Sequence, residues 1–429
     1  MEQSLAGKKL LIMGGRPAAT PDIVRSARRM GIYTIVTDNV PPERSPAKLL
    51  ADAYWDISTA EVERLAEKVK AEGIDGIFTG VHEFNLKRTR ELCALCGMPF
   101  YATEEQLRLN FDKTFFKEQC VRAGITVPES YTVSDPPLDA QLQAVRYPVI
   151  VKPRDGGGGV GVTICEDETE LRQAIPGAVA GSPTGRFVVE EYVRGREITA
   201  VYTMKNGQIS LSALRDRYPT RDHDRVTSQY DLSLMPSRYL PLFLAQSDPG
   251  FRRLLESVHA ADGCVFFQGI AAPERIVFFE CGYRLNALCD YHNIQDACGV
   301  SYLDMMIRYA LTGSMGDADL SAEDPALPFF SGIFNMTARP GVIGRMTGRE
   351  EALQLANVIA ADYLKVPGDT ITDDAAMTQS VFRAHVRGRD REELAEVIHR
   401  IQTLVRVEDV HGENMLFRPF DTQRLYEPF

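Results

Sequence analysis

The first hundred residues alternate short apolar runs with amphipathic stretches. The runs KKLLIMGG, YTIVTD and GIFTG are separated by helical patterns near residues 22–30 and 61–70. Apolar β-type runs that alternate with helices are typical of a parallel sheet whose strands are joined by crossover helices. The pattern predicts a half-Rossmann domain over residues 1–110.

A different pattern begins at Phe111. A helical stretch over 112–122 precedes the apolar strand YPVIVKP, and β-rich segments follow, with a hairpin signal, KNGQ, around Asn206 and Gly207. This mixture predicts a central α+β domain over residues 111–328.

The end of the chain forms a third unit. An acidic segment over 313–328 that contains proline and glycine is typical of a linker or surface crossover. After it, the strand patterns SGIFNMTA and SVFRAHV and the helical pattern REELAEVIHRIQTL predict a small α+β domain over 329–429. The expected fold class is therefore α/β and α+β, in three domains.

Composition and charge narrow the functions. Hydrophobic residues make up 44% of the 429 residues and charged residues 25%, as in an ordinary globular enzyme. The 59 acidic and 48 basic side chains give a formal charge of −11. This negative field repels phosphate backbones and anionic lipids, so we expect neither a nucleic-acid nor a membrane partner.

Targeting signals and cysteines point to one compartment. The first residues lack a cleavable leader, and no segment reaches the roughly 18–20 apolar residues that span a bilayer. The eight cysteines are scattered through apolar runs, and the pair Cys93 and Cys96 has no second pair with which to bind zinc. We expect core thiols and a cytoplasmic protein.

The segment YPVIVKPRDGGGGVGVT is the most informative motif. Its strand ends at Lys152 and enters a run of glycines, whose backbone N–H groups can approach a phosphate chain closely. The glycines are Gly156, Gly157, Gly158, Gly159 and Gly161. The motif GxxxxGK[ST] is absent, so this is a phosphate lid of another kind. A flexible surface loop is the alternative.

The amino-terminal glycine pair is weaker evidence for a nucleotide site. GGRPAA follows the first strand, but it lacks the third glycine of GxGxxG, and Pro17 removes an N–H that a phosphate would need. We therefore favour a half-Rossmann scaffold for another ligand over an NAD site.

Four motifs in a fixed order resemble the ATP-grasp superfamily. They are Lys113, Lys152 with its glycine loop, FVVEEYVRGREIT and VFFECGYRLNA. The resemblance covers residues 111 to about 311, and the flanking domains resemble the carboxylate-amine ligase branch, which includes L-amino acid ligases, biotin carboxylase and carbamoyl phosphate synthetase. It implies a half-Rossmann domain, a central ATP-grasp domain and a small α+β domain.

The resemblance assigns residues to ATP. Lys113 and Lys152 match the two lysines that reach the nucleotide phosphates, and fixed positive charges there would offset part of the triphosphate charge. Glu190 or Glu191 would accept from the adenine amino group, while Tyr192 and Val193 present their backbone to the ring. Glu197 matches the residue that binds the ribose hydroxyls. Solvent-facing glutamates on an edge strand are the alternative.

The same resemblance predicts a metal site on two strands, CVFFQG and FFECGYRLNA. Gln268 and Glu280 would lie on neighbouring antiparallel strands, and oxygen ligands of this kind suit Mg²⁺, with Mn²⁺ as an alternative. Where the family usually has an asparagine, this chain has Gly282. We expect water or Asn286 to fill that ligand position, and an asparagine at position 282 to be tolerated.

Further residues are candidates for substrate binding and catalysis. Arg284 would hold the transferring phosphoryl group, and Arg215, on a strand, is a second candidate for phosphate or carboxylate binding. Glu83, at the end of a parallel strand, and His292, just after the metal strand, are candidates for the substrate side. An exposed arginine and a structural histidine are the alternatives for Arg215 and His292.

These assignments predict an ATP-dependent ligase that forms a C–N bond through an acyl phosphate, with small-molecule carboxylate and amine substrates. The chemistry needs no side-chain nucleophile. One alternative is a nucleotide-binding module without turnover, and another is a bicarbonate-activating enzyme of the carboxylase or carbamoyl phosphate type. The sequence does not identify the acid or the amine, and it leaves open whether the protein forms a homodimer.

Overall fold

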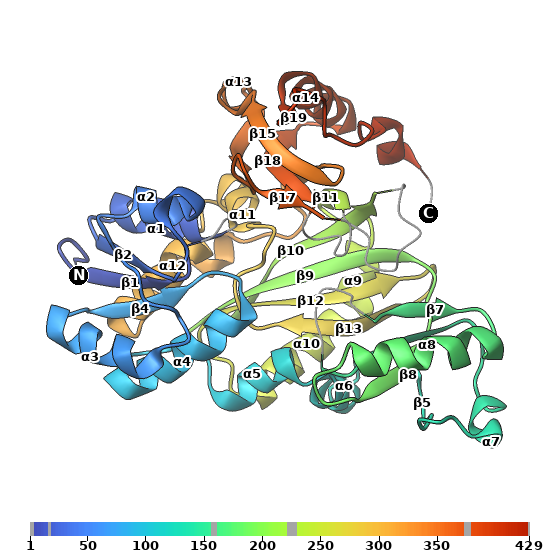
Figure 1. Ribbon diagram of the computed structural model, residues 1–429. Helices are drawn as coiled ribbons and strands as arrows, with labels where there is room; N and C mark the ends of the chain where they lie inside the picture. The colour runs from blue at the N-terminus through green and yellow to red at the C-terminus, as the bar shows by residue number, and fades with distance from the viewer. Residues whose placement is uncertain (1–3, 16–18, 156–160, 221–229, 373–378, 428–429) are drawn as a thin grey trace.

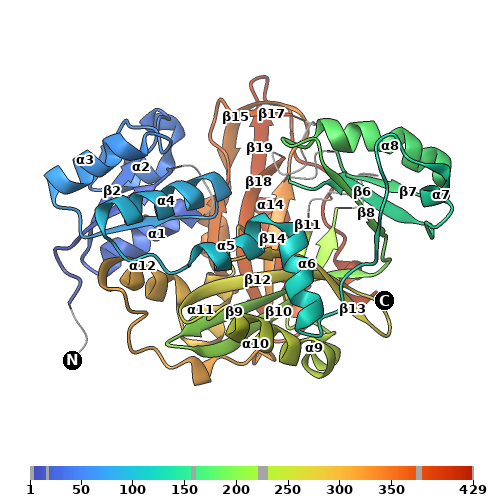
Figure 2. The same ribbon diagram turned by 90° about the horizontal axis from the view of Figure 1, so that it is seen from below.

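The computed structural model describes residues 4–15, 19–155, 161–220, 230–372 and 379–427. Figure 1 shows a long central sheet, with the amino-terminal domain at one end and the carboxyl-terminal part of the chain, from about residue 341, packed above it. In the view from below, the amino-terminal domain and a small sheet formed by residues 130–191 lie on opposite sides of the large sheet (Figure 2). Gly156, Gly157, Gly158 and Gly159 of the predicted loop fall outside the described residues.

The amino-terminal domain is a parallel sheet with helices, as the alternating pattern predicted. Its strand order is β3-β2-β1-β4. The strands are β1 (Lys9–Met13), β2 (Tyr33–Thr37), β3 (Ala53–Trp55) and β4 (Gly76–Thr79). The helices are α1 (Ala19–Arg29), η1 (Pro42–Arg44), α2 (Pro46–Leu50), α3 (Val62–Glu72) and α4 (Glu83–Cys96).

An antiparallel sheet of eight strands carries the centre of the molecule, in the order β13-β12-β9-β10-β11-β14-β18-β16. The strands are β9 (Arg196–Lys205), β10 (Gln208–Pro219), β11 (Tyr230–Met235), β12 (Gly263–Ala271), β13 (Ile276–Gly282), β14 (Phe330–Thr337), β16 (Val358–Tyr363) and β18 (Ser380–Gly388). Because β14 pairs with β11, the sheet runs through the domain boundary predicted at residue 328.

Helices and two smaller sheets surround this sheet. Those from the central region are α5 (Glu104–Phe111), α6 (Lys113–Arg122), β5 (Ser130–Tyr131), α7 (Asp139–Leu142), β6 (Val149–Pro153), β7 (Thr163–Cys165), α8 (Glu168–Ala180), β8 (Phe187–Glu191), α9 (Leu240–Gln246), α10 (Asp248–Ser257), α11 (Tyr291–Cys298), α12 (Tyr302–Thr312) and η2 (Leu320–Ala322). Those from the carboxyl-terminal region are β15 (Gly341–Thr347), α13 (Arg349–Leu353), β17 (Thr370–Ile371), α14 (Arg391–Leu404), β19 (Arg406–Asp409) and η4 (Thr422–Tyr426).

One face of the large sheet is apolar and packs on α9 and α10. Phe267 of β12 stacks on Phe251 of α10 with ring centroids 4.1 Å apart, and Phe278 of β13 meets Phe251 edge-on at 4.6 Å. Since side chains alternate along a strand, Gln268, next to Phe267, points to the opposite face, and an irregularity in the register between β12 and β13 places Glu280 opposite Gln268. That opposite face carries the polar residues described below.

The described residues include no helix that is both long and apolar enough to cross a bilayer. All eight cysteines are free thiols, and Cys93 and Cys96 both lie on α4.

Candidate active site

A row of polar side chains crosses four strands on the face of the large sheet that points away from α10. Glu280 of β13 lies opposite Gln268 of β12, Gln268 lies opposite Thr199 of β9, and Thr199 lies opposite Arg215 of β10. The hairpin of β12 and β13 therefore places the predicted metal residues, Gln268 and Glu280, directly side by side.

Hydrogen bonds extend this pair to the ribose candidate. The Gln268 amide donates to Glu280 Oε2 at 3.0 Å and accepts from Arg217 Nη1 at 2.8 Å. Arg217 also contacts Glu197 Oε2 at 3.1 Å, and the Tyr230 hydroxyl donates to that same oxygen at 2.6 Å. The guanidinium of Arg217 lies over the Tyr230 ring, 3.3 Å from its centroid. The metal and ribose candidates thus share one network.

Arg217 and Arg215 have different surroundings although they point to the same face of β10. The Arg215 side chain is 1% exposed and Nη2 lies 3.2 Å from Asp290 Oδ2. Its Nε and Nη1 have no hydrogen-bond partner among the described residues. Arg217 contacts the Gln268–Glu280 pair, so it is the functional candidate that sequence reasoning missed. Its spacing of two from Arg215 was the available signal.

Two lysines converge on one buried carboxylate. Glu190 of β8 contacts Lys152 of β6 at 2.7 Å and Lys117 of α6 at 2.8 Å. Burial alone would raise the pKa of the Glu190 carboxyl, but the charges of Lys152 and Lys117 outweigh burial and lower that pKa. Glu190 therefore positions the lysine side chains. Lys117 follows Lys113 by four residues on α6, a helical spacing from which it was predictable.

Lys113, at the start of α6, lies in the field of these groups. Burial lowers the pKa of its ammonium, and the positive charge of Lys152 lowers that pKa further. The negative charges of Glu280, Glu190 and Glu83 raise the pKa but do not offset these two effects. An anion that binds between two positive side chains in a partly buried site reduces the repulsion between them. The arrangement fits a bound phosphate chain.

Polar groups of Glu191 and Tyr192, the two residues after Glu190, already have partners within the protein. Glu191 forms an ion pair with Arg275, and its backbone N–H donates to Glu129 at 2.8 Å. The N–H of Tyr192 donates to the carbonyl of Pro148 at 3.1 Å, and Val193 is buried.

The structure argues against an asparagine at position 282, which we expected to be tolerated. Gly282 pairs directly with Phe266 of β12, and a Cβ built on Gly282 would lie 2.1 Å from that phenyl ring. Phe266 is 5% exposed and Arg284 lies over its ring, 5.2 Å from the centroid. The phenyl ring thus takes the space that a side chain at position 282 would need.

The segment after β13 faces the amino-terminal domain. Arg284 Nη2 lies 3.4 Å from Glu83 Oε1, at the start of α4. His292 Nε2 lies 2.9 Å from Asp22 Oδ2, on α1. Asn286 is buried, and its side-chain oxygen accepts from the N–H of Leu288 at 2.9 Å. Asn286 therefore closes a local turn, which makes it less available as the metal ligand we expected.

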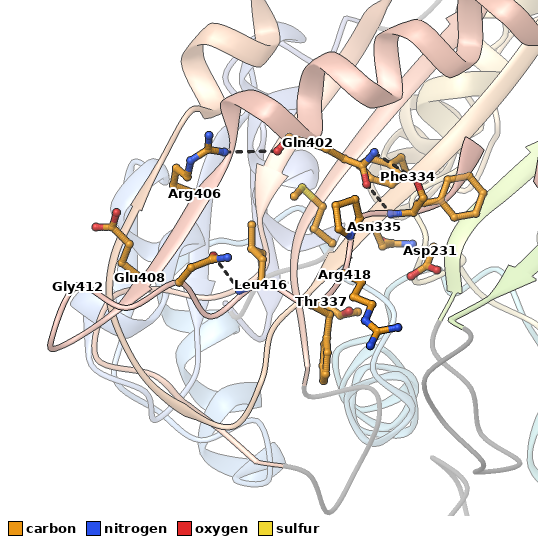
Figure 3. Close-up of a pocket in the computed structure, with 15 residues that line it drawn as sticks. Asp231, Phe334, Asn335, Thr337, Gln402, Arg406, Glu408, Gly412, Leu416 and Arg418 are labelled. Carbon is orange, nitrogen blue, oxygen red and sulfur yellow. Dashed lines mark hydrogen bonds between the residues drawn. The ribbon is translucent and has the colours of Figure 1, made fainter. Parts of the chain in front are cut away.

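A cavity of about 480 Å³ lies beside this network, between the ends of β11 and β14 and the loop after β19. Figure 3 shows Asp231 at the border with β11 and Arg418 beside Thr337. Asn335, on the cavity wall, donates to the carbonyl of Tyr230 at 3.1 Å. This bond joins the cavity wall to the backbone of Tyr230, whose hydroxyl contacts Glu197.

Comparison with protein families identifies part of the central region. The family model described as D-ala D-ala ligase C-terminus matches residues 124–234. By sequence, the chain is 26% identical over 322 residues to the carbamoyl phosphate synthase large chain of Clostridium beijerinckii, which covers 71% of this chain and 29% of that protein. The chain spans 26% to 56% of the length of the first curated relatives that it matches.

Solved structures match over nearly the whole chain. The biotin carboxylase domain of the Hydrogenobacter thermophilus 2-oxoglutarate carboxylase, solved with MgADP, ADP and bicarbonate, gives a TM-score of 0.76 at 19% identity and covers 94% of this chain and 90% of its own. The L-amino acid ligase from Bacillus licheniformis gives 0.72 at 15% identity, covering 94% and 99%. Together with the family match, these likenesses confirm the predicted resemblance and fold class: the chain has the ATP-grasp fold and is similar to ATP-dependent ligases of the ATP-grasp superfamily.

Proposed function

We propose that this protein is an ATP-dependent ligase that activates a carboxylate as an acyl phosphate and transfers the acyl group to an amine. The observation that carries the proposal is the Gln268–Glu280 pair on neighbouring strands, linked at 2.8 Å through Arg217 to Glu197. The convergence of Lys152 and Lys117 on Glu190 supports it from the other side of the site.

The residues fit Mg²⁺ with ATP. One carboxylate and one amide oxygen are a donor set that Mg²⁺ takes from proteins, while phosphate oxygens and water complete its shell. Glu280 and Gln268 would hold the metal, with Mn²⁺ as an alternative. A bound divalent ion supplies charge neutralisation to the phosphates at this place.

Side chains of the protein carry out the remaining steps of binding and catalysis. Lys113 and Lys152 bind the phosphates, and Glu197 binds the ribose hydroxyls while Tyr230 fixes its orientation. Arg284 and Arg217 stabilise the charge that develops when the carboxylate oxygen attacks the terminal phosphorus. Arg215, two residues before Arg217, is held in a buried pair with Asp290. In the second step the amine nitrogen forms the C–N bond and phosphate leaves.

The substrates are a small-molecule carboxylate and a small-molecule amine, in a cytoplasmic enzyme of three domains over residues 1–110, 111–328 and 329–429. The cavity bordered by Asn335 and Arg418 adjoins the network and has room for part of one substrate. Since the biotin carboxylase domain from Hydrogenobacter thermophilus was solved as a dimer, we also propose that a homodimer is compatible with this fold.

Lys152→Met should weaken ATP binding by about 10- to 150-fold. A charge-assisted contact is worth roughly 1.5–3 kcal/mol, and methionine keeps the length of the side chain without its charge. Isothermal titration calorimetry with Mg-ATP measures the change. Lys70→Met, at an exposed lysine on α3, is the matched control and should leave the affinity unchanged. Equal affinities of the Lys152 variant and wild type would remove this lysine from the phosphate site.

A screen of carboxylic acids with hydroxylamine in place of the unknown amine tests the function. ATP-dependent hydroxamate, together with equimolar ADP, is the expected product with at least one acid. A nucleotide-binding module without turnover would gain thermal stability with Mg-ATP but release no ADP with any acid. ADP release with bicarbonate as the only acid that acts would favour the bicarbonate-activating alternative.

A further inference from the structure

A histidine–carboxylate pair joins the amino-terminal domain to the rest of the protein. His292 Nε2 lies 2.9 Å from Asp22 Oδ2, the Tyr291 hydroxyl donates to that same oxygen at 2.7 Å, and Arg25 contacts the other oxygen at 2.7 Å. A carboxylate held in this way accepts from Nε2–H and so fixes the imidazole tautomer. The second nitrogen, Nδ1, then carries a lone pair.

The neighbouring His385 is already engaged. Its ring centroid lies 4.7 Å from that of His292, and its side chain is buried on β18. Its Nδ1 donates to the Asn293 side-chain oxygen at 2.6 Å, because the Asn293 amide nitrogen itself donates to Ser331. Burial lowers the pKa of His385 well below its usual value, and the charge of His292 lowers it further. His385 therefore stays neutral.

The His292 ring is accessible. Its side chain is 23% exposed, and its Nδ1 has no hydrogen-bond partner among the described residues. The cluster thus holds a partly exposed imidazole by its Nε2 on a buried carboxylate and leaves its Nδ1 without a partner among the described residues.

The cluster lies where a ligand of the amino-terminal sheet is expected. Helices α1 and α4 follow the neighbouring parallel strands β1 and β4, so both begin at the carboxyl edge of that sheet. Asp22 of α1 reaches His292, and Glu83 of α4 reaches Arg284. Residues 284–292 therefore lie along the edge at which open α/β sheets bind their ligands. One end of this segment follows the metal strand and the other carries His292.

The groups that surround His292 come from several elements. The charged and titratable ones are Asp22 and Arg25 of α1, Tyr291 beside it, Cys289 before it, Arg383 and His385 of β18, Asp362 of β16 behind Arg25, and Arg215 with Asp290 behind His385. Asp22 is the acid that contacts the imidazole.

Resting on the ligase function proposed above, we propose that His292 Nδ1 is the base that deprotonates the incoming amine, with Asp22 as its positioning residue. An amine arrives at neutral pH as an ammonium ion, and it cannot attack until one proton passes to Nδ1. The nitrogen then forms the C–N bond with the acyl carbon while the C–O bond to phosphate breaks. The phosphate leaves with that electron pair and takes up the second proton.

A comparison of two nucleophiles, hydroxylamine and ammonium, distinguishes a catalytic role of His292 from a structural one. Hydroxylamine is largely unprotonated at neutral pH and needs no base, whereas ammonium must lose a proton first. With the acid that gives most hydroxamate, His292→Gln should slow amide formation from ammonium chloride about a hundredfold more than it slows hydroxamate formation. Raising the pH toward about 9 should recover part of that rate. His399→Gln, at an exposed histidine on α14, is the matched control.

Asp22→Asn adds a second readout. Its amide oxygen can keep the hydrogen bond from Nε2–H, but it offers no negative charge to balance the proton that Nδ1 takes up, so amide formation from ammonium should slow more than hydroxamate formation. Equal losses of hydroxamate and amide in His292→Gln, or a wild type that makes hydroxamate but no amide from ammonium at any pH between about 6 and 9, would overturn the base while leaving the ligase function standing. A wild type that makes neither product would overturn both.

Discussion

Glu280→Gln is expected to reduce ADP formation by more than about a hundredfold. Glu280 is the carboxylate of the proposed metal pair, opposite Gln268, and its loss would leave Mg²⁺ with two neutral amides. Electrostatic groups aimed at developing charge typically contribute about 10²- to 10³-fold each. Steady-state ADP release over a series of Mg²⁺ concentrations measures the effect, and excess Mg²⁺ should restore only part of the rate.

The matched control is Glu274→Gln, in the exposed turn that joins the same two strands. It removes one negative charge from the same hairpin without touching the pair, so its rate should equal that of wild type. Thermal unfolding of both variants verifies that they fold. A Glu280→Gln variant that is folded and retains full activity would show that the metal does not bind at this hairpin.

Gly282→Ala is expected to destabilise the protein by about 1–3 kcal/mol, and Gly282→Asn by more. The new Cβ would meet the Phe266 ring at 2.1 Å, and a buried ring in a packed sheet cannot retreat without displacing Arg284, which lies over it. Activity should fall with stability because Arg284 would lose its position. Urea unfolding gives the free-energy change, and ADP release gives the rate.

Two comparisons make this prediction specific. Gly177→Ala on α8 places its Cβ in open space, so it should be neutral or slightly stabilising. Combining Phe266→Ala with Gly282→Ala should cost less than the sum of the single changes, with a coupling of about 0.5–3 kcal/mol, because the ring that causes the clash is gone. Strict additivity would show that the phenyl ring does not exclude a side chain at position 282.

The sequence predicted the fold well because the patterns that carry it are local. The parallel sheet followed from the alternation of strands and helices, and the placement of Gln268 opposite Glu280 followed from a short hairpin, whose register a turn determines. The continuity of the large sheet between β11 and β14 was not predictable, because pairing between strands about a hundred residues apart leaves no local pattern.

The contacts within the candidate site were only partly predictable from the sequence. Arg217, and not Arg215, touches the Gln268–Glu280 pair, since burial beside Asp290 is a tertiary effect that the spacing of two cannot reveal. The same holds for Phe266, which fills the space beside Gly282 from another strand. The partner of His292, Asp22, is 270 residues away in the chain.

Transfer of oxygen from the acid to phosphate tests the central claim most directly. The acid that gives most hydroxamate is labelled in its carboxylate with oxygen-18 and incubated with ATP, Mg²⁺ and hydroxylamine, and the phosphate is examined by phosphorus NMR. Attack of the carboxylate on the terminal phosphorus predicts one labelled oxygen in each phosphate released. Unlabelled phosphate, released at the same rate as hydroxamate, would contradict an acyl phosphate and with it the proposed mechanism.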